Sequence, residues 1–305
     1  MAQKTGSPVA AAIAGASGAR PGPELIQLRE LIYQTTGIFQ PNLKLHLLAD
    51  ACSSRMQALD LPTLGRYYEF LTAPTSGHAE LSALLNRITV GETCFFRNQP
   101  QLDALCNVVL PRIVRARQPM PKRHLRIWSA GCSTGEEPYT LSLLLLEELT
   151  GRLQGWTFEI FATDINENSI AHAVQGVYGC QTTQNLSSDF RDRYFTTNED
   201  RLQINGDLKA CVQFSRLNLL DEASVAQLKD LDLILCCNVL IYFGGTSKRR
   251  VVQHFYENLL PHGYLFLGHS ESLYGVSKDF QLVHLPSAIA YVKSENKSLM
   301  APMEL

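Results

Sequence analysis

The sequence predicts an α/β protein with two domains: a small all-helical domain, then a larger domain built on a mostly parallel, doubly wound sheet. Three observations predict this fold. Residues 24–88 carry apolar side chains at helical spacing and show no strand-like alternation. Strand-like and helix-like segments alternate from residue 125 onward. A glycine-containing turn, residues 131–135, follows the first of these strands, as in nucleotide-type βαβ units.

The composition is that of an ordinary globular chain. Its 305 residues are 45% hydrophobic and 18% charged, with a formal net charge of -2, so the chain is long enough to bury a core. The near-neutral balance argues against a nucleic-acid partner, which requires clustered Lys and Arg. No apolar run approaches the ~20 residues that a membrane-spanning helix needs, so we expect no membrane insertion.

The eight cysteines are scattered, and no two are spaced as C-x-x-C. This pattern predicts neither a disulfide framework nor a structural metal site. We therefore expect reduced cysteines, no bound metal and a cytoplasmic location, with a monomer as the default oligomeric state.

Composition and periodicity divide the chain into five parts. The expected parts are a disordered tail rich in Ala, Gly and Ser (1–23), the helical domain (24–88), a linker and helix (89–124), the larger domain (125–293) and a C-terminal tail (294–305). From about 190 to 217 the larger domain loses its regular alternation, which indicates an inserted β-subdomain. Asn205 followed by Gly206 indicates a hairpin within it.

Individual elements follow from the same patterns. Apolar residues at helical spacing predict four helices in the first domain, and another from about residue 99 to 117. In the larger domain, strands are expected at 125–129, 157–163, 231–236 and 264–268. Helices are expected at 138–149, through Ile170 and Ala173, and at about 250–259.

The stretch WSAGCSTGEEPY, residues 128–139, admits two interpretations. Residues 131–135 fit G-x-S-x-G, the strand-to-helix turn that presents a nucleophilic serine in α/β-hydrolases. They also fit the first turn of a cofactor-binding βαβ unit. A hydrolase would have several strands before this turn, whereas here the upstream segment is helical. Glu136 and Glu137 would also oppose an oxyanion at the start of the next helix, so the cofactor interpretation is favoured.

Asp164 ends the second expected strand, where a carboxylate can accept both hydroxyl groups of a ribose. The alternative is that Asp164 caps the next helix, a role that Asn166 can also fill. The glycines do not form G-x-G-x-x-G, which disfavours a dinucleotide with its pyrophosphate. A nucleoside cofactor without a pyrophosphate, such as S-adenosylmethionine (SAM), is compatible with this turn.

Together, five motifs identify a resemblance. They are Phe95-Phe96-Arg97, STGEEPY (133–139), ATDI (162–165), NVLIYF (238–243) and GHSESL (268–273). In this order they resemble the CheR-type chemotaxis receptor protein-glutamate O-methyltransferases, over about residues 25–291. The resemblance implies a Rossmann-like SAM-dependent methyltransferase domain with an inserted β-subdomain, preceded by a small all-helical domain. It also implies methyl transfer from SAM to glutamate side chains on the cytoplasmic helices of chemoreceptors, which leaves methyl esters and S-adenosylhomocysteine.

The resemblance carries roles over to individual residues. Arg97 and Tyr242 are the residues implied to lie closest to the transferring methyl group. Because a glutamate side chain is already ionised near neutral pH, no general base is required. Arg97 can steer the incoming carboxylate and Tyr242 can orient it, although Tyr242 can equally be an amphipathic core residue. The implied cofactor-binding residues are Gly91, Thr93, Arg97, Glu137, Asp164 (ribose), Asn218, Leu219, Cys237 and Asn238.

The sequence also departs from the family pattern. Gly91 and Cys237 stand where family members often carry Asn and many carry Arg, so only backbone contacts to the cofactor remain there. The helix that is arginine-rich in the family keeps only Arg55 and the earlier Lys44, which predicts weak steering onto an acidic receptor. These departures motivate an alternative, a catalytically weak or inactive cofactor-binding scaffold. Glu271, in the last motif, is expected only to stabilise a turn at a strand end.

Overall fold

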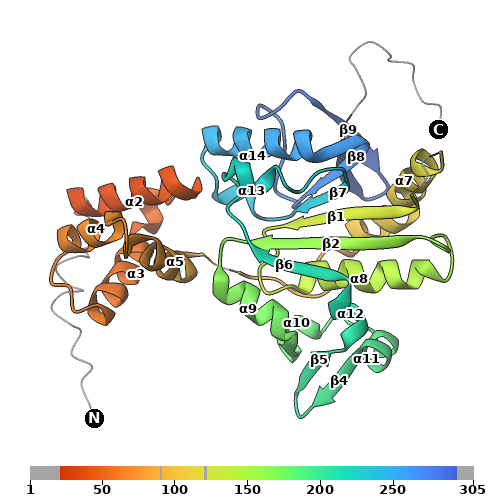
Figure 1. The fold of residues 1–305 in the computed structure, drawn as a ribbon, viewed down its shortest axis with the longest axis horizontal. Coiled ribbons are helices and arrows are strands. Elements are labelled where there is room, and N and C mark those ends of the chain that lie inside the picture. The colour runs from red at the N-terminus through yellow and green to blue at the C-terminus, as the bar shows by residue number, and fades with distance from the viewer. Residues whose placement is uncertain (1–20, 90, 120–121, 294–305) are drawn as a thin grey trace. The chain divides into compact units, whose positions relative to one another are not determined.

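A computed structural model describes residues 21–89, 91–119 and 122–293 of the chain (Figure 1). Backbone contacts group them into two units. One holds the described residues before position 90 together with Tyr242–Gly244, and the other holds the rest. Most of the two expected tails, 1–23 and 294–305, lies outside the described residues, and Pro23 already begins the first described helix. Within the described ranges, no helix is long and apolar enough to cross a membrane.

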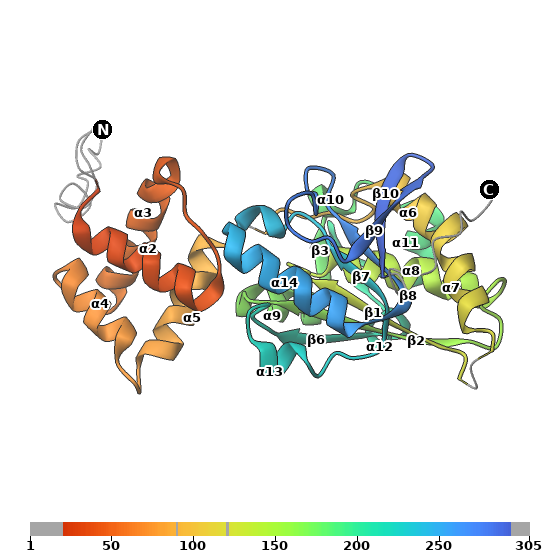
Figure 2. The same cartoon turned by 90° about the horizontal axis from the view of Figure 1, so that it is seen from above.

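The first unit is helical, as the periodicity predicts (Figure 2). Apolar residues three and four apart, such as Leu28 and Ile32, are fully buried and form its core. The first helix ends at Gly37, whose left-handed backbone (φ 75°) suits a residue without a Cβ. The helices are α2 (Pro23–Thr36), a short 3₁₀ turn η1 (Asn42–Lys44), α3 (Leu45–Ala58), α4 (Leu64–Thr72) and α5 (Gly77–Ile88).

One buried carboxylate connects three helices of this unit. Glu80 on α5 is 5% exposed and accepts two hydrogen bonds from Arg55 on α3, at 2.9 and 2.7 Å. The hydroxyl of Tyr67 on α4 donates to the same carboxylate at 2.7 Å. Arg55, one of the two basic residues expected to face an acidic receptor, is therefore bound inside the unit.

The second unit contains a seven-stranded sheet of order β6-β2-β1-β7-β8-β10-β9. The first five strands pair in parallel, and β10 pairs antiparallel with both of its neighbours, β8 and β9, so the prediction of a mostly parallel sheet is confirmed. The three strands β6, β9 and β10 were not expected from the sequence. The strands are β1 (His124–Ala130), β2 (Thr157–Asp164), β6 (Val212–Arg216), β7 (Leu231–Cys236), β8 (Leu259–Leu267), β9 (Phe280–Leu285) and β10 (Ala288–Lys293).

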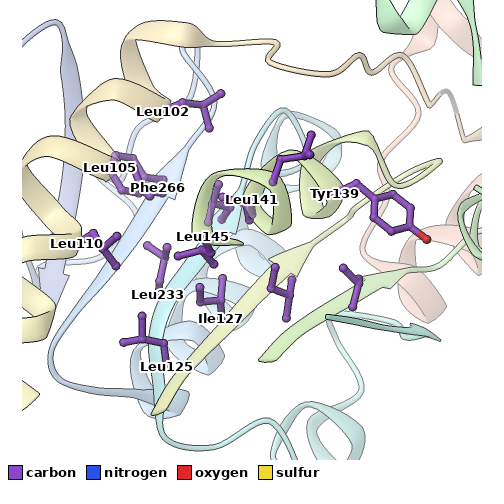
Figure 3. Close-up of a cluster of buried hydrophobic side chains, with 14 of the residues drawn as sticks. Leu102, Leu105, Leu110, Leu125, Ile127, Tyr139, Leu141, Leu145, Leu233 and Phe266 are labelled. Atoms are coloured by element: carbon purple, nitrogen blue, oxygen red, sulfur yellow. The ribbon is translucent and has the colours of Figure 1, made fainter. Parts of the chain in front are cut away.

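Helices cover both faces of this sheet. On one face, Leu125 and Ile127 of β1 belong to an apolar cluster with Leu141 of α8 (Glu136–Leu149) and Leu110 of the helix before the sheet (Figure 3). On the other face, Trp128 packs edge-on against Phe255 of α14 (Gly245–Asn258), with ring centroids 5.2 Å apart. Alternate residues of β1 thus enter opposite cores, as strand geometry requires.

The expected helix at 99–117 forms as three joined segments. These are α6 (Gln99–Ala104), a π-helical turn η2 (Leu105–Val109) and α7 (Leu110–Arg117). The other helices of the main layer are α9 (Glu167–Gln175) and the short α13 (Glu222–Val225).

The inserted subdomain differs from its expected bounds of 190–217. It already begins with β3 (Val177–Gly179), which completes a second sheet of order β3-β5-β4, whereas β6 belongs to the main sheet. The hairpin joins β4 (Phe195–Asn198) to β5 (Arg201–Ile204), so placing it at Asn205 and Gly206 was wrong. Asn205 instead caps a helix, because short Asn side chains readily accept N–H groups at helix starts. The helices are α10 (Cys180–Thr183), α11 (Ser188–Tyr194) and α12 (Gly206–Ala210).

Candidate cofactor site

The turn between β1 and α8 brings three backbone N–H groups onto β2. Gly131 and Cys132 both donate to the carbonyl of Thr163, at 2.8 and 2.9 Å. Ser133 donates its backbone N–H to the Asp164 carboxylate at 2.9 Å. Gly131 has φ 81°, and a Cβ there would lie 2.5 Å from the Val239 side chain. Only glycine therefore allows this close approach of the turn to the loop after β7.

Asp164 lies at the carboxyl end of β2, directly beside this turn. Its second oxygen accepts the backbone N–H of Asn166 at 2.8 Å, and each carboxylate oxygen keeps further lone-pair capacity. Burial raises the pKa of Asp164, while these backbone hydrogen bonds act in the opposite direction. Asn166, not Asp164, caps α9, with its side chain accepting from Ser169 at 3.0 Å. The helix-cap alternative for Asp164 therefore does not hold.

Glu137, in the first turn of α8, supplies a second carboxylate. It accepts a hydrogen bond from the Ser129 hydroxyl at 2.7 Å. Burial raises its pKa, while the hydrogen bond from Ser129 and the charge of Arg97 act in the opposite direction. Ser129, which orients this carboxylate, was missed by the sequence reasoning. Its position on a buried strand just before the turn was the available signal.

The linker that carries Thr93 and Arg97 runs beside the turn. A Cβ at Gly91 would lie 2.4 Å from the Ser133 hydroxyl oxygen, so this glycine allows the linker to approach the turn. Arg97 is exposed, and its guanidinium donates to the carbonyl of Glu92 at 2.6 Å. Thr93 is half-buried.

The loop after β7 carries Cys237 and Asn238. Asn238 has a left-handed backbone (φ 62°), and its N–H donates to the Glu271 carboxylate at 2.7 Å. The Cys237 thiol donates to the side-chain oxygen of Gln101 at 3.5 Å. Glu271 therefore does more than close its own turn, because it also holds a loop that carries two of the expected cofactor residues.

Asn218 and Leu219 follow β6 in a tight loop. The Asn218 side chain accepts the backbone N–H of Leu220 at 3.0 Å. The carbonyl of Leu219 lies 3.0 Å from Nδ1 of the buried His254 on α14, which therefore carries its proton on that nitrogen. Because the carbonyl of Leu219 is occupied in this way, its orientation is set by α14.

Tyr242 lies at the end of the 3₁₀ turn η3 (Leu240–Tyr242), in the segment grouped with the helical unit. It is 37% exposed. An amphipathic core position therefore does not describe it, because a residue in a core would be buried.

The hydrolase interpretation of the turn fails on geometry. Among the described residues, the Ser133 hydroxyl has no hydrogen-bond partner, although its oxygen is buried. A nucleophilic serine needs a base within hydrogen-bond reach. Asp164 binds the backbone N–H of Ser133 rather than its hydroxyl.

Residues from five segments thus surround the carboxyl edge of the parallel strands, where open α/β sheets bind their ligands. SAM carries an ammonium group and two ribose hydroxyls, all of which are hydrogen-bond donors. Asp164 and Glu137 are the matching acceptors. The residues present therefore fit this cofactor.

Comparison with known proteins agrees with this fit. The chain matches the all-alpha domain of the CheR methyltransferases over residues 23–89 and their SAM binding domain over residues 91–289. It is 38% identical to chemotaxis protein methyltransferase 2 of Vibrio cholerae, over 88% of this chain and 92% of the relative.

Two further relatives are more distant. The chemotaxis protein methyltransferase of Borreliella burgdorferi is 33% identical, over 83% of this chain and 89% of the relative. That of Salmonella typhimurium is also 33% identical, over 83% of this chain and 85% of the relative. With its two matched domains and its similarity to these relatives, this chain belongs to the CheR family of SAM-dependent methyltransferases.

Proposed function

We propose that this chain transfers a methyl group from SAM to glutamate side chains of chemoreceptors, forming methyl esters during chemotactic adaptation and leaving S-adenosylhomocysteine. The observation that carries the proposal is the pair of partly buried carboxylates, Asp164 and Glu137, beside the turn at the carboxyl edge of the sheet. Burial raises the pKa of each, so each gains from a ligand that brings donors or a positive charge. The curated relatives named above are chemotaxis methyltransferases, which supports the same substrate class.

The cofactor-binding roles are assigned by position. Asp164 holds the ribose and Glu137 holds the ammonium group. The remaining contacts are assigned to Gly91, Thr93, Arg97, Asn218, Leu219, Cys237 and Asn238. SAM, when bound, supplies an electrophilic methyl group.

The protein's own residues position the acceptor. A glutamate side chain is ionised near neutral pH, so no side chain is needed to remove a proton. One N–H of the Arg97 guanidinium donates to the Glu92 carbonyl. The remaining N–H groups of the guanidinium can donate to the carboxylate of the substrate glutamate. We assign to the Tyr242 hydroxyl a hydrogen bond that orients the same carboxylate. Catalysis then rests on orientation and exclusion of water.

The inactive-scaffold alternative has no support among the described residues. Its motivation was the loss of side chains at Gly91 and Cys237. Gly91 allows the close approach of Ser133, and the Cys237 thiol has a defined partner in Gln101. Both positions therefore have defined neighbours, which supports a role for each in the proposed site. We place the protein in the cytoplasm as a monomer whose partner is the cytoplasmic part of a receptor.

The cofactor site is tested by calorimetric titration of S-adenosylhomocysteine into the wild type, Asp164→Asn and the control Asp221→Asn. Asp221 is an exposed helix cap, bound to Ser224, and its substitution is expected to leave the affinity unchanged. We expect micromolar binding by the wild type, about -8 kcal/mol, and at least about tenfold weaker binding by Asp164→Asn. Absence of binding in a folded wild type would contradict the proposal.

The reaction is tested by incubating the protein with methyl-labelled SAM and a receptor cytoplasmic fragment. A glutamate methyl ester releases its label as methanol in mild alkali. Label that survives alkali treatment would rule out an ester product.

A further inference from the structure

Tyr178 connects the inserted subdomain to the cofactor-binding turn. It lies on β3 and is 1% exposed, and its hydroxyl donates to the carbonyl of Thr134 at 2.6 Å. Burial raises the pKa of this hydroxyl well above its ordinary value, so the group keeps its proton and remains a donor. A Cβ at Gly135 would lie 3.0 Å from the same hydroxyl oxygen, which shows how closely the turn packs on Tyr178.

The ring of Tyr178 also contacts the linker. Phe95, which lies between Thr93 and Arg97, meets it edge-on with ring centroids 5.0 Å apart. The inserted subdomain holds both backbone polar groups of Phe95. Its N–H donates to the carbonyl of Thr182 at 2.9 Å, and its carbonyl accepts from the Asn185 side chain at 3.2 Å.

Two of the segments that Tyr178 contacts, the turn and the linker, lead to or carry expected cofactor residues. The turn continues into Glu137, and the linker carries Thr93 and Arg97. Neither segment belongs to a strand of the main sheet, so their relative position depends on contacts such as these.

We propose that Tyr178 is a positioning residue of the cofactor site, and that the inserted subdomain is thereby a structural part of that site. The inference rests on the proposed cofactor-binding role of the turn and linker. Tyr178 touches neither reactant. It holds the Thr134 carbonyl through a hydrogen bond and the Phe95 ring through an edge-on contact. The turn and the linker are thereby fixed relative to one another before the cofactor binds.

The test compares Tyr178→Phe with Tyr194→Phe. Tyr194 belongs to the same subdomain and also donates one hydroxyl hydrogen bond of 2.6 Å, but to Glu147, far along α8 from the turn. Both variants keep the ring and lose one donor, so both should lose some thermal stability. Only Tyr178→Phe is expected to bind S-adenosylhomocysteine more weakly, by about fivefold to tenfold. Its KM for SAM should rise while its KM for the receptor fragment stays unchanged.

A second variant, Phe95→Leu, removes the ring contact instead of the hydroxyl and should produce the same rise in KM for SAM. Wild-type affinity in both Tyr178→Phe and Phe95→Leu would overturn the inference. Equal losses in Tyr178→Phe and Tyr194→Phe would also overturn it, because the effect would then be general loosening. Failure of the wild type to bind would instead count against the proposed function itself.

Discussion

The carboxylate of Glu271 accepts a hydrogen bond from the backbone N–H of Asn238 at 2.7 Å, across 33 residues of sequence. The same carboxylate accepts from Ile241 at 3.1 Å and from Gly268 at 2.7 Å. A Cβ at Gly268 would lie 2.6 Å from the Asn238 nitrogen, so glycine is required for the two loops to meet. One side chain therefore holds the loop after β7, in which Asn238 has a left-handed backbone.

Glu271→Gln should weaken cofactor binding by about tenfold, because an amide cannot accept three N–H groups with both of its ends. Hydrogen exchange should accelerate at the amides of Asn238 and Ile241. The control is Glu222→Gln, an exposed residue on α13. Unchanged affinity and unchanged exchange in Glu271→Gln would show that the carboxylate only closes its own turn.

Gly91→Ala should also weaken binding, because the new Cβ would lie 2.4 Å from the Ser133 hydroxyl oxygen. Removing that oxygen leaves Ser133 Cβ as the nearest atom of this residue, at 3.6 Å, which is an ordinary contact. The double variant Gly91→Ala/Ser133→Ala should therefore recover affinity toward that of Ser133→Ala alone. Titration calorimetry on the wild type, the two single variants and the double variant gives the coupling free energy between positions 91 and 133. Strictly additive losses would contradict the proposed clash.

The Ser133→Ala variant also tests the hydrolase interpretation. A serine hydrolase would lose its activity on this substitution, whereas the methyltransferase is expected to keep its own. Loss of methyl transfer with intact cofactor binding would reopen the question of what the serine does.

Asp232→Asn should change the pH dependence of stability. Asp232 is 3% exposed, and burial raises its pKa from an ordinary 3.8 to about 6, against the backbone N–H of Arg126 and the charge of Arg117. The folded state therefore binds more protons than the unfolded state over this range. Protonation of Asp232 therefore contributes to the free energy of unfolding. This contribution is present below about pH 4 and is lost as the pH rises through about 6.

The wild type should lose about 2 kcal/mol relative to Asp232→Asn between pH 4 and pH 7, from a pKa difference of about two units. Urea unfolding can be followed by tryptophan fluorescence, since the two tryptophans, Trp128 and Trp156, both lie in the second unit. A difference between the two proteins that does not vary with pH would refute this assignment.

Glu80→Gln should destabilise the helical unit by roughly 2 kcal/mol, because Arg55 and Tyr67 would share an amide in place of a buried carboxylate. Glu69→Gln is the matched control. Glu69 pairs with Arg66 on the surface, where the two side chains are 65% and 68% exposed, and such pairs contribute under about 1 kcal/mol. Thermal unfolding followed by circular dichroism measures the loss of stability in both variants. Equal shifts of the unfolding midpoint in the two variants would mean that the buried network contributes no more to stability than a surface ion pair.

The sequence by itself determined the class of fold and the position of its main elements. Residues such as Leu28 and Ile32 recur at helical spacing because one face of the helix is buried. The strand 231–236 is recognisable because all six of its residues are buried, which demands a continuous apolar run apart from Asp232. The motifs around Asp164 and Glu137 likewise identified the family, because the residue types that bind a cofactor are encoded locally.

Other features were decided only by tertiary structure. The strands β9 and β10 have exposed residues such as Leu282 and Ile289, so their sequence lacks the pattern of a buried strand. Asn205 has the local character of a turn residue, and only the neighbouring strands make it a helix cap. The contacts of Glu271 with Asn238 and of Tyr178 with Thr134 join segments 33 and 44 residues apart. No local pattern reports such pairs, because they exist only once the chain has packed.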